Sequence, residues 1–464
     1  MTTPKQPNVL LFVPHDLGDY LGCCGHAGVR SPHLDSLAER GVRCSQYFTP
    51  APECTPSRSS MFTGLYTHQN GLMGLSNFGW QLRPEVSHLA ELLARGGYAT
   101  HLFGLQHETD ASPEQLGYQN LHAQDGRRAD NVCRALAEFL GQPEAQDGPW
   151  FAHAGFFDVH RPWPENTDFS PGEIEVPPFL PDSPILRRDL ARFHQNILDM
   201  DRAVGRVLDA LQEAGLEEDT IVIFTTDHGP ALPHAKATFY DPGIRLPLII
   251  RRPGHLDGGR VYEELLSNVD FTPTLLDLCG CPTPEGLAGR SFSSLLRGDP
   301  YEEREAVYGA LFYDVSYDPM HYVRTRTHKY IRSFAATTEE AAGADRRVLA
   351  THEAGKWIRV DDLDVMTGPA WQVMKPTCEP PPPEELYDLE ADPLEMNDIA
   401  SDPAAGETLD SMRDLLRSMM ERTASPLLEG HVAPPPEQIT AAQRFRPGSP
   451  EHQERVQERW RRIQ

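Results

Sequence analysis

The sequence of 464 residues has no long apolar run and only eight cysteines. The apolar run at 9–13 is too short for a signal-peptide core or a membrane span, and no small-residue cleavage site follows it. No later segment approaches the roughly 18 apolar residues of a membrane helix. The cysteines show neither paired metal-ribbon spacing nor the density of a secreted disulfide scaffold, and Cys279-Gly280-Cys281 has no second pair. We therefore expect a cytoplasmic protein without a membrane partner.

Basic residues are also in short supply. Lys and Arg number 42 against 68 Asp and Glu, which gives a formal net charge of -26. Nucleic acids attract basic surfaces, so the balance argues against a nucleic-acid partner. The negative electrostatic field of the whole protein also disfavours capture of a long anionic polymer. A small anionic substrate would have to be bound by a local cluster of positive groups.

The first two-thirds of the chain alternates short apolar segments with amphipathic ones. Strands are expected at 9–13, 100–103, 150–156, 220–225 and 246–250, and helices at 31–40, 87–95, 129–140, 186–214 and 272–278. Such alternation predicts an α/β layer with a large, mostly parallel sheet flanked by helices.

The pattern changes near residue 300. Strands expected at 306–313 and 321–334 have no long helix between them, which indicates a smaller antiparallel subdomain. Pro380–Pro383 is a stiff linker-like run, and after it we expect a strand at 385–389 and a helix at 407–423. The predicted organisation is a catalytic α/β domain at 1–300, an α+β subdomain at 301–430, and an extended or helical tail at 431–464. We interpret the tail as a surface arm or a contact in a homo-oligomer.

Acidic residues follow two of the expected strands directly. Asp16 comes after the first strand, and Asp227-His228-Gly229 comes after the strand at 220–225. Open α/β sheets place ligand-binding residues at the carboxyl ends of strands. A single Asp there is usually a turn or cap residue, but two can converge on a divalent cation, which prefers carboxylate oxygens.

Cys54 lies in the segment Cys54-Thr55-Pro56-Ser57-Arg58. By residue type alone, the simpler interpretation is a thiol of lowered pKa beside an arginine. The segment, however, matches in full the CxPSR motif at which formylglycine-generating enzyme converts a cysteine thiol into an aldehyde. The following Met61–Leu65 segment resembles the helix that comes after this motif in sulfatases.

The chain resembles the type I, formylglycine-dependent sulfatases over most of its length. The similar segments are 8–16 (their opening metal-binding strand), 31–38 ("TPNLDRLA"), 226–229 ("SDNG/SDHG"), 236–247 ("K…GGIRVP") and 386–395 ("LYDLxxDPxE"). Within the family, 67–75 is most similar to the N-sulfoglucosamine sulfohydrolases, or sulfamidases. The resemblance implies an alkaline-phosphatase-like sandwich fold.

The resemblance also implies roles for individual residues. Formylglycine made from Cys54 would be hydrated, attack sulfur through one hydroxyl, and expel sulfate with the help of the other. Arg58 would hold the formylglycine oxygens. The remaining implied residues are His107 as the base for the sulfated intermediate, His160 as a sulfate contact and acid, and Lys236 as a sulfate ligand. One divalent metal would be held by Asp16, His15, Cys54, Asp227 and His228.

Two positions depart from the family pattern. His15 stands where the family has the first Asp of an Asp-Asp pair, and Leu105 stands at the lysine of its "GKWH" segment. The two imidazoles of His15 and His228 make Mn²⁺ or Zn²⁺ plausible beside Ca²⁺, the metal that we expect first.

The expected function is hydrolysis of sulfate esters or sulfamates of a small sulfated sugar. The alternative is a formylglycine-dependent phosphodiesterase or phosphonate monoester hydrolase, because those relatives share the Asp-His-Gly variant and also depart from Asp-Asp. A third class is a non-catalytic relative that binds anions, for which the loss of lysine at Leu105 is the only support.

Overall fold

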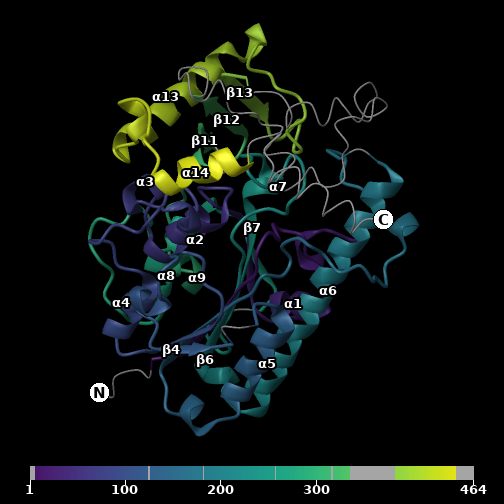
Figure 1. Cartoon of the computed structure of the whole chain (residues 1–464), viewed down its shortest axis with the longest axis vertical. Coiled ribbons are helices and arrows are strands. Elements are labelled where there is room, and N and C mark those ends of the chain that lie inside the picture. The colour runs from purple at the N-terminus through teal and green to yellow at the C-terminus, as the bar shows by residue number, and fades with distance from the viewer. Residues whose placement is uncertain are drawn as a thin grey trace.

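Figure 1 shows the fold in a computed structural model that describes residues 6–123, 126–180, 182–256, 258–314, 317–334 and 382–445. A large sheet with helices on both faces occupies the lower part of this view, and a smaller sheet with one long helix lies above it. Cys378, part of the proline run at 380–383 and the end of the tail lie outside the described residues. Within the described ranges, we find no helix with the length and apolar character that a membrane crossing requires.

The large sheet has the strand order β4-β3-β5-β1-β6-β7-β2-β8, with β9 also paired to β2. Its strands are β1 (Asn8–Val13), β2 (Val42–Phe48), β3 (Ala99–Gly104), β4 (Asn120–His122), β5 (Trp150–Gly155), β6 (Thr220–Phe224), β7 (Arg245–Arg251), β8 (Arg260–Tyr262) and β9 (Leu266–Ser267). All described pairings are parallel except those of β7, which runs antiparallel to β6 and β2. The expected mostly parallel sheet is therefore confirmed.

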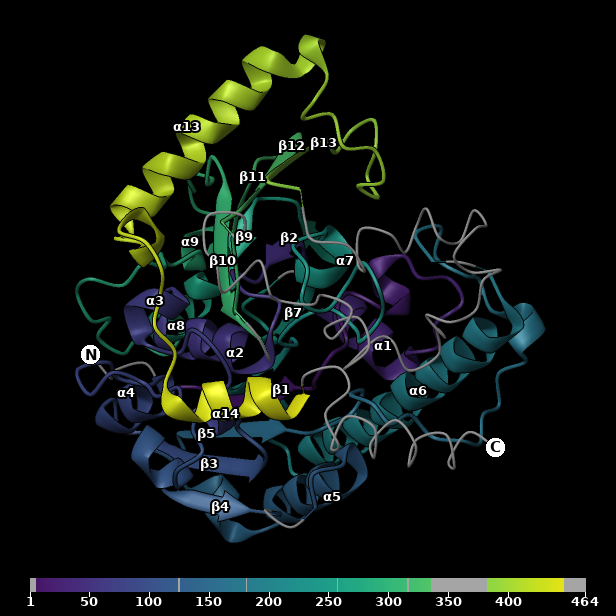
Figure 2. The same cartoon turned by 45° about the horizontal axis from the view of Figure 1, so that its top comes forward.

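The helices cover both faces of this sheet, as Figure 2 shows. They are α1 (Pro32–Arg40), α2 (Cys54–Thr63), α3 (Thr67–Asn70), α4 (Leu89–Arg95), α5 (Ala129–Leu140), α6 (Pro184–Glu213), α7 (Asp241–Ile244), α8 (Phe271–Leu278) and α9 (Ser293–Arg297). Because side chains alternate along a strand, Leu10 and Phe12 join the core under α1, α5 and α6, whereas Val9 and Leu11 join the core under α4, α8 and α9. Both faces of β1 are thus buried, as is typical of a central parallel strand.

Strand β2 is one element that the sequence did not predict. Its burial alternates only at the start, and its register shifts between Cys44 and Tyr47 where it pairs with β7. The bulge breaks the period of two on which strand prediction depends. The strand nevertheless matters, since it leads directly into the loop before α2.

The smaller sheet is antiparallel, in the order β10-β11-β12-β13. Its strands are β10 (Val307–Tyr313), β11 (Tyr317–Arg324), β12 (His328–Ser333) and β13 (Glu384–Asp388), with helix α13 (Gly406–Arg422) packed beside them. The segment expected to form a strand at 321–334 is split into β11 and β12 by a turn in which Thr325 N–H donates to the carbonyl of His328. The antiparallel subdomain is confirmed.

The two sheets meet through a buried ionic and apolar junction. Asp241 of α7 accepts hydrogen bonds from Arg324 of β11 at 3.0 Å and from Lys329 of β12 at 2.5 Å. Phe48 of β2 and Tyr322 of β11 belong to the same apolar cluster. This shared core crosses the domain boundary predicted at residue 300. The boundary itself remains a prediction.

The described part of the tail is not a free arm. Val432 is buried, and helix α14 (Pro436–Phe445) packs against the short helical turn Ser76–Phe78. Gln438 accepts a hydrogen bond from Trp80 Nε1 at 3.0 Å and donates to the carbonyl of Asp314 at 2.9 Å. This part of the tail is therefore anchored to the body by Gln438 of α14 and by Val432, and its interpretation as a surface arm or an oligomer contact stays a prediction.

Candidate active site

The site lies where several parallel strands end. Strands β1 and β6 are adjacent and in register, with Phe12 opposite Phe224. Their carboxyl ends therefore bring Asp16 and Asp227 together, although 211 residues separate them. The structure thus brings the two acidic segments together, and their role as metal ligands stays a prediction.

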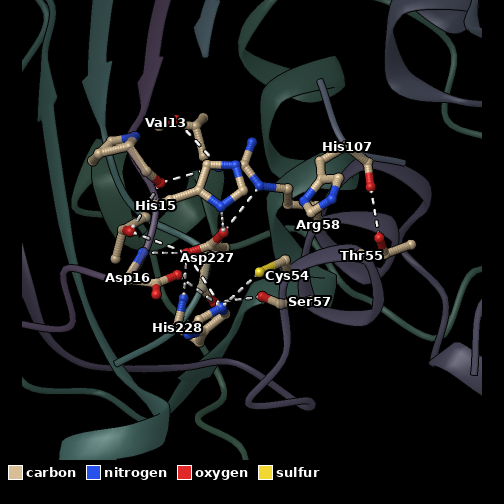
Figure 3. A network of polar contacts seen from close by, with 12 residues as sticks. Val13, His15, Asp16, Cys54, Thr55, Ser57, Arg58, His107, Asp227 and His228 are labelled. Carbon is tan, nitrogen blue, oxygen red and sulfur yellow. Dashed lines mark hydrogen bonds and ion pairs between the residues drawn. The ribbon is translucent and has the colours of Figure 1, made fainter. Parts of the chain in front are cut away.

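Cys54 is the first residue of α2 and is buried at the centre of this cluster, as Figure 3 shows. Every residue of α2 is buried, which is unusual for a helix with so many polar residues. Ser57 explains part of this, since its hydroxyl donates to the carbonyl of Asp227 at 2.5 Å and accepts from Asn268 Nδ2 at 3.1 Å. The hydroxyls of the motif thus fix the helix against the strand ends.

Asp227 is the hub of the hydrogen-bond network. Its Oδ1 accepts from the backbone N–H groups of Asp16 at 3.0 Å and His228 at 2.9 Å, and its Oδ2 accepts from Arg58 Nε at 3.0 Å. His15 Nδ1 lies 3.0 Å from the same Oδ2. Burial opposes ionisation of this carboxyl, but His228, His15 and Arg58 outweigh it and hold the pKa of Asp227 well below its usual range.

Asp16 is the second fully buried carboxylate. Lys236 Nζ donates to its Oδ2 at 2.9 Å, and His160 Nε2 lies 3.8 Å from the same oxygen. Burial again opposes ionisation, and the neighbouring His160, Lys236 and His228 outweigh it and lower the pKa of Asp16. The left-handed backbone of Asp16, with φ of 55°, turns the chain sharply at the end of β1.

His228 faces Cys54 and Asp16 with its Nε2 atom. Its Nδ1 donates to the carbonyl of Gly229 at 2.9 Å, so Nε2 carries the lone pair in the neutral ring. Nε2 lies 3.3 Å from Cys54 Sγ and 3.4 Å from Asp16 Oδ1. The glycine is required here, because a side chain at Gly229 would collide with the carbonyl of Pro242.

These groups fit a divalent cation. One ligand atom each from His15, Asp16, Cys54 and Asp227 lies within 4.8 Å of the others, and all four residues are buried. Asp16 Oδ1 and His15 Nε2 are buried without a hydrogen-bond partner in the described residues. Ligand atoms whose lone pairs point at one another repel, and a cation bound between them removes this repulsion.

Cys54 is poorly suited to act as a free thiolate. Burial raises the pKa of its thiol well above the usual range, and Asp16 adds to this effect, whereas Lys236 opposes it. The alternative of a simple thiol with a lowered pKa is therefore disfavoured.

Arg58 is fully buried, and its contacts reach the end of β1. Besides Asp227, it donates to the carbonyls of Gln106 at 3.3 Å, Val13 at 3.3 Å and Pro14 at 3.1 Å. The arginine thus links α2 to the ends of β1, β3 and β6. Its planar group with five N–H donors suits this linking position.

The remaining predicted residues line the same site. His107 has φ of 94°, and its carbonyl accepts from the hydroxyl of Thr55 at 2.8 Å. Burial lowers the pKa of His107 well below the usual range, and the neighbouring His15 and Arg58 lower it further. His160 Nδ1 donates to the carbonyl of Arg161 at 2.6 Å, which leaves Nε2 facing Asp16. Leu105 is buried, and its aliphatic side chain supplies no charge where the family has a lysine.

Glu108 is a site residue that the sequence did not reveal. Its side chain is 1% exposed, lies 4.0 Å from Arg58 Nη1, and has no hydrogen-bond partner for either oxygen among the described residues. Burial raises its pKa to about 7 against the opposing effect of Arg58. The polar segment around it resembles an exposed loop, and no spacing rule distinguishes it.

Comparison with known proteins agrees with this geometry. The family description "Sulfatase" matches residues 7–281, and "N-sulphoglucosamine sulphohydrolase, C-terminal" matches residues 233–345. The human N-sulphoglucosamine sulphohydrolase is 29% identical over 91% of this chain and 91% of its own length. Human arylsulfatase A is 29% identical over 76% of this chain and 81% of its own length.

Solved structures show the same fold. The phosphonate monoester hydrolase of Agrobacterium radiobacter superposes with a TM-score of 0.71 at 22% identity, covering 90% of this chain and 96% of that one. The expected alkaline-phosphatase-like architecture is thereby confirmed. Because the sulfatase match spans residues 7–281, including all the residues that meet at this site, the chain belongs to the sulfatase family of hydrolases.

Proposed function

We propose that the chain hydrolyses sulfate esters or sulfamates of small sulfated sugars, with formylglycine made from Cys54 as the nucleophile. The observation that carries the proposal is the position of Cys54 at the start of a fully buried helix, 3.3 Å from His228 and beside two ionised carboxylates. The similarity to a human N-sulphoglucosamine sulphohydrolase over 91% of the chain supports the sulfamate part of the proposal.

The metal would be held by Asp16, Asp227 and His228, with His15 either binding it or positioned by Asp227 just outside. When bound, such an ion polarises sulfate oxygens and lowers the pKa of the nucleophile. Ca²⁺ is our first proposal because two carboxylates supply hard oxygen ligands, and Mn²⁺ or Zn²⁺ are the alternatives because of the imidazoles.

Positive and proton-carrying groups surround the nucleophile. Lys236, held at 2.9 Å from Asp16, would also bind a sulfate oxygen. His160 keeps its Nδ1–H on the carbonyl of Arg161, so Nε2 would carry the proton that goes to the leaving group. His107 would act as the base for release of sulfate, since its lowered pKa keeps the ring neutral. Arg58 would orient the nucleophile from its position between Asp227 and the carbonyls at the end of β1.

Several finer features belong to the same proposal. The chain would require a formylglycine-generating enzyme as a maturation partner. We propose a cytoplasmic location, which the unpaired state of the seven described cysteines supports. Homo-oligomer formation stays a prediction.

A phosphodiester or phosphonate monoester is the second candidate substrate. The observation in its favour is the position of His15 beside Asp227-His228-Gly229. Phosphonate monoester hydrolases resemble this chain in having Asp-His-Gly and in lacking the opening Asp-Asp pair. The third class, a non-catalytic anion binder, has only Leu105 in its favour. The intact cluster around Cys54 argues against it.

Two measurements test the proposal. Peptide mass analysis should find the Cys54 peptide about 18 Da lighter after conversion of CH₂–SH to CHO. Side-by-side kinetics on an aryl sulfate, an N-sulfated glucosamine and a phosphonate monoester should give the highest kcat/KM for a sulfur-containing substrate. Cys54→Ala should abolish turnover, whereas the matched variant Cys24→Ala, at a half-buried cysteine outside the site, should retain it. Full activity with unmodified Cys54, or faster cleavage of the phosphonate, would contradict the proposal.

A further inference from the structure

The site contains a second set of possible metal ligands that differs in chemistry from the carboxylates. One ligand atom each from His15, Cys54 and His107 lies within 4.8 Å of the others. Two imidazoles and a sulfur form a soft donor set, which favours Zn²⁺ over Ca²⁺. The set exists because His15 replaces an acidic residue of the family pattern.

His15 is already oriented as a metal ligand. Its Nδ1 lies 3.0 Å from Asp227 Oδ2, and both ring nitrogens are buried without a hydrogen bond of good geometry in the described residues. Histidines that bind zinc commonly place the other ring nitrogen on a carboxylate, which fixes the ring and its tautomer. The exposed fraction of His15 is 0%, so neither ring nitrogen is open to solvent.

His107 is held opposite His15. The two ring centroids are 5.2 Å apart and the ring planes are tilted by 53°. Its Nδ1 is buried and likewise has no hydrogen-bond partner among the described residues. Because the hydroxyl of Thr55 donates to the carbonyl of His107 at 2.8 Å, the backbone of His107 is fixed relative to the residue that follows Cys54.

We propose that folded copies of the chain in which Cys54 remains a thiol bind one Zn²⁺ through Cys54 Sγ and the rings of His15 and His107. Tetrahedral zinc, with bonds of about 2.0–2.3 Å, needs ligand atoms about 3.3–3.7 Å apart, so only small side-chain movements are required. The thiol proton goes to solvent, the sulfur donates an electron pair to zinc, and no atom changes its oxidation state.

This zinc state would have a direct consequence for maturation. Conversion of Cys54 removes the sulfur and with it the soft site, while Asp16 and Asp227 remain for the catalytic ion. With Ca²⁺ in the carboxylate site, zinc content would therefore measure the unconverted fraction of the protein. The inference rests on the proposed function in that it takes Cys54 as the precursor of formylglycine, but its test measures metal binding by the thiol form and requires no turnover.

The experiment compares preparations of the full chain made with different amounts of formylglycine-generating enzyme. After dialysis against Zn²⁺ and removal of loosely bound ion, zinc per chain is plotted against the fraction of unconverted Cys54 from peptide mass analysis. We expect a slope of about one zinc per thiol. Cys54→Ser should bind one zinc per chain fewer than the unconverted protein. Cys24→Ser should bind the same amount of zinc as the unconverted protein.

Cobalt replaces zinc as a spectroscopic probe. With Co²⁺ alone, the thiol form should show a thiolate-to-cobalt charge-transfer band in the near ultraviolet that is absent from Cys54→Ser. His15→Asn should weaken Co²⁺ binding by about 10-fold or more through loss of one ligand, with circular dichroism confirming that the variant is folded. Binding of Co²⁺ without this band, or zinc content independent of the thiol fraction, would overturn the inference.

The two proposals can fail separately. Zinc bound through Cys54 in a chain that formylglycine-generating enzyme never converts would refute the proposed function and retain the inference. Conversion and sulfatase turnover, together with a thiol form that takes up no zinc, would refute the inference alone.

Discussion

Asp227 shows how one buried carboxylate serves several parts of the site at once. It accepts hydrogen bonds from Arg58 and from two backbone N–H groups, and it orients His15. The network is satisfied only while the carboxylate is charged, because Arg58 is fully buried and would otherwise lose its charged partner.

We therefore predict a large effect for Asp227→Asn, which keeps the shape and removes the charge. Divalent-metal affinity should fall by about 10- to 100-fold or more, and kcat/KM should fall at least as far. Calorimetric titration with Ca²⁺ and steady-state kinetics would measure both. Asp209→Asn, at an exposed position of α6, is the matched control. Unchanged metal affinity in Asp227→Asn would remove Asp227 from the proposed ligand set.

Buried histidines outside the site affect the stability of the strands in which they lie. His321 of β11 lies in the small sheet, where its Nδ1 donates to the carbonyl of Gly309 at 3.1 Å and its Nε2 accepts from the hydroxyl of Ser425 at 2.8 Å. Burial, with a smaller contribution from His68, lowers its pKa from 6.5 to about 3. The folded ring thus stays neutral at pH values where the unfolded chain is protonated.

The sign of the resulting pH effect follows from this difference. The contribution of His321 to stability is complete above pH 6.5 and is lost as the pH falls toward about 3, because only the unfolded state gains the proton. Between pH 7 and pH 5 the loss should be about 2 kcal/mol. In His321→Gln, whose amide can serve both partners, the difference in melting temperature from the unchanged protein should shrink at pH 5. His255→Gln, at an exposed residue, should show no such change.

Helix α14 is linked to the site through the segment at 75–80. Trp80 donates to Gln438, and within the same segment the N–H of Ser76 donates to the hydroxyl of Thr55 at 3.3 Å. The C-terminal part of the chain therefore supports the loop beside Cys54.

Gln438→Ala should remove the hydrogen bonds that Gln438 makes with the Trp80 indole N–H and with the Asp314 carbonyl. Loss of these two buried hydrogen bonds should cost about 1–3 kcal/mol of unfolding free energy, with a smaller loss of turnover. Thermal unfolding and kcat would be compared with Thr440→Ala, an exposed position on the same helix. Equal stability of the two variants would show that α14 contributes little to the fold.

At the scale of the whole molecule, a net charge of -26 surrounds a site that must bind anions. Lys236 and Arg58 are buried and each lies beside a carboxylate, so their charge acts over a short range. Exposed charges are screened beyond about 8 Å at physiological salt but act over about 30 Å at 0.01 M.

Salt should therefore affect substrates according to their size. Raising NaCl from 10 to 150 mM should change kcat/KM for a sulfated monosaccharide by less than about twofold, whereas a long sulfated polymer should be cleaved several-fold faster as repulsion is screened. Kinetics on a polymer and its short fragments would measure this. Preference for the intact polymer at low salt would contradict the expected action on small sugars.

Local patterns were sufficient for much of this protein. The apolar periodicity predicted strands β1, β3, β5, β6 and β7 and helices α1, α4, α5, α6 and α8, because buried strands and amphipathic helices leave their period in the sequence. The motif at Cys54 and the acidic residues after β1 and β6, together with the family resemblance that added His107, His160 and Lys236, predicted nine residues that the structure brings together.

Only the tertiary structure decided the rest. Strand β2 lost its period to a bulge, α14 proved to be packed and not free, and Glu108 became a buried neighbour of Arg58. Each depends on contacts between residues far apart in the chain, and these contacts leave no regular spacing to detect. The sequence by itself determined which chemical groups are present and that strand ends would carry them. Which nitrogen of His15 faces Asp227, and which remains for a metal, was decided by packing, since the orientation of a ring depends on its neighbours and not on its position in the chain.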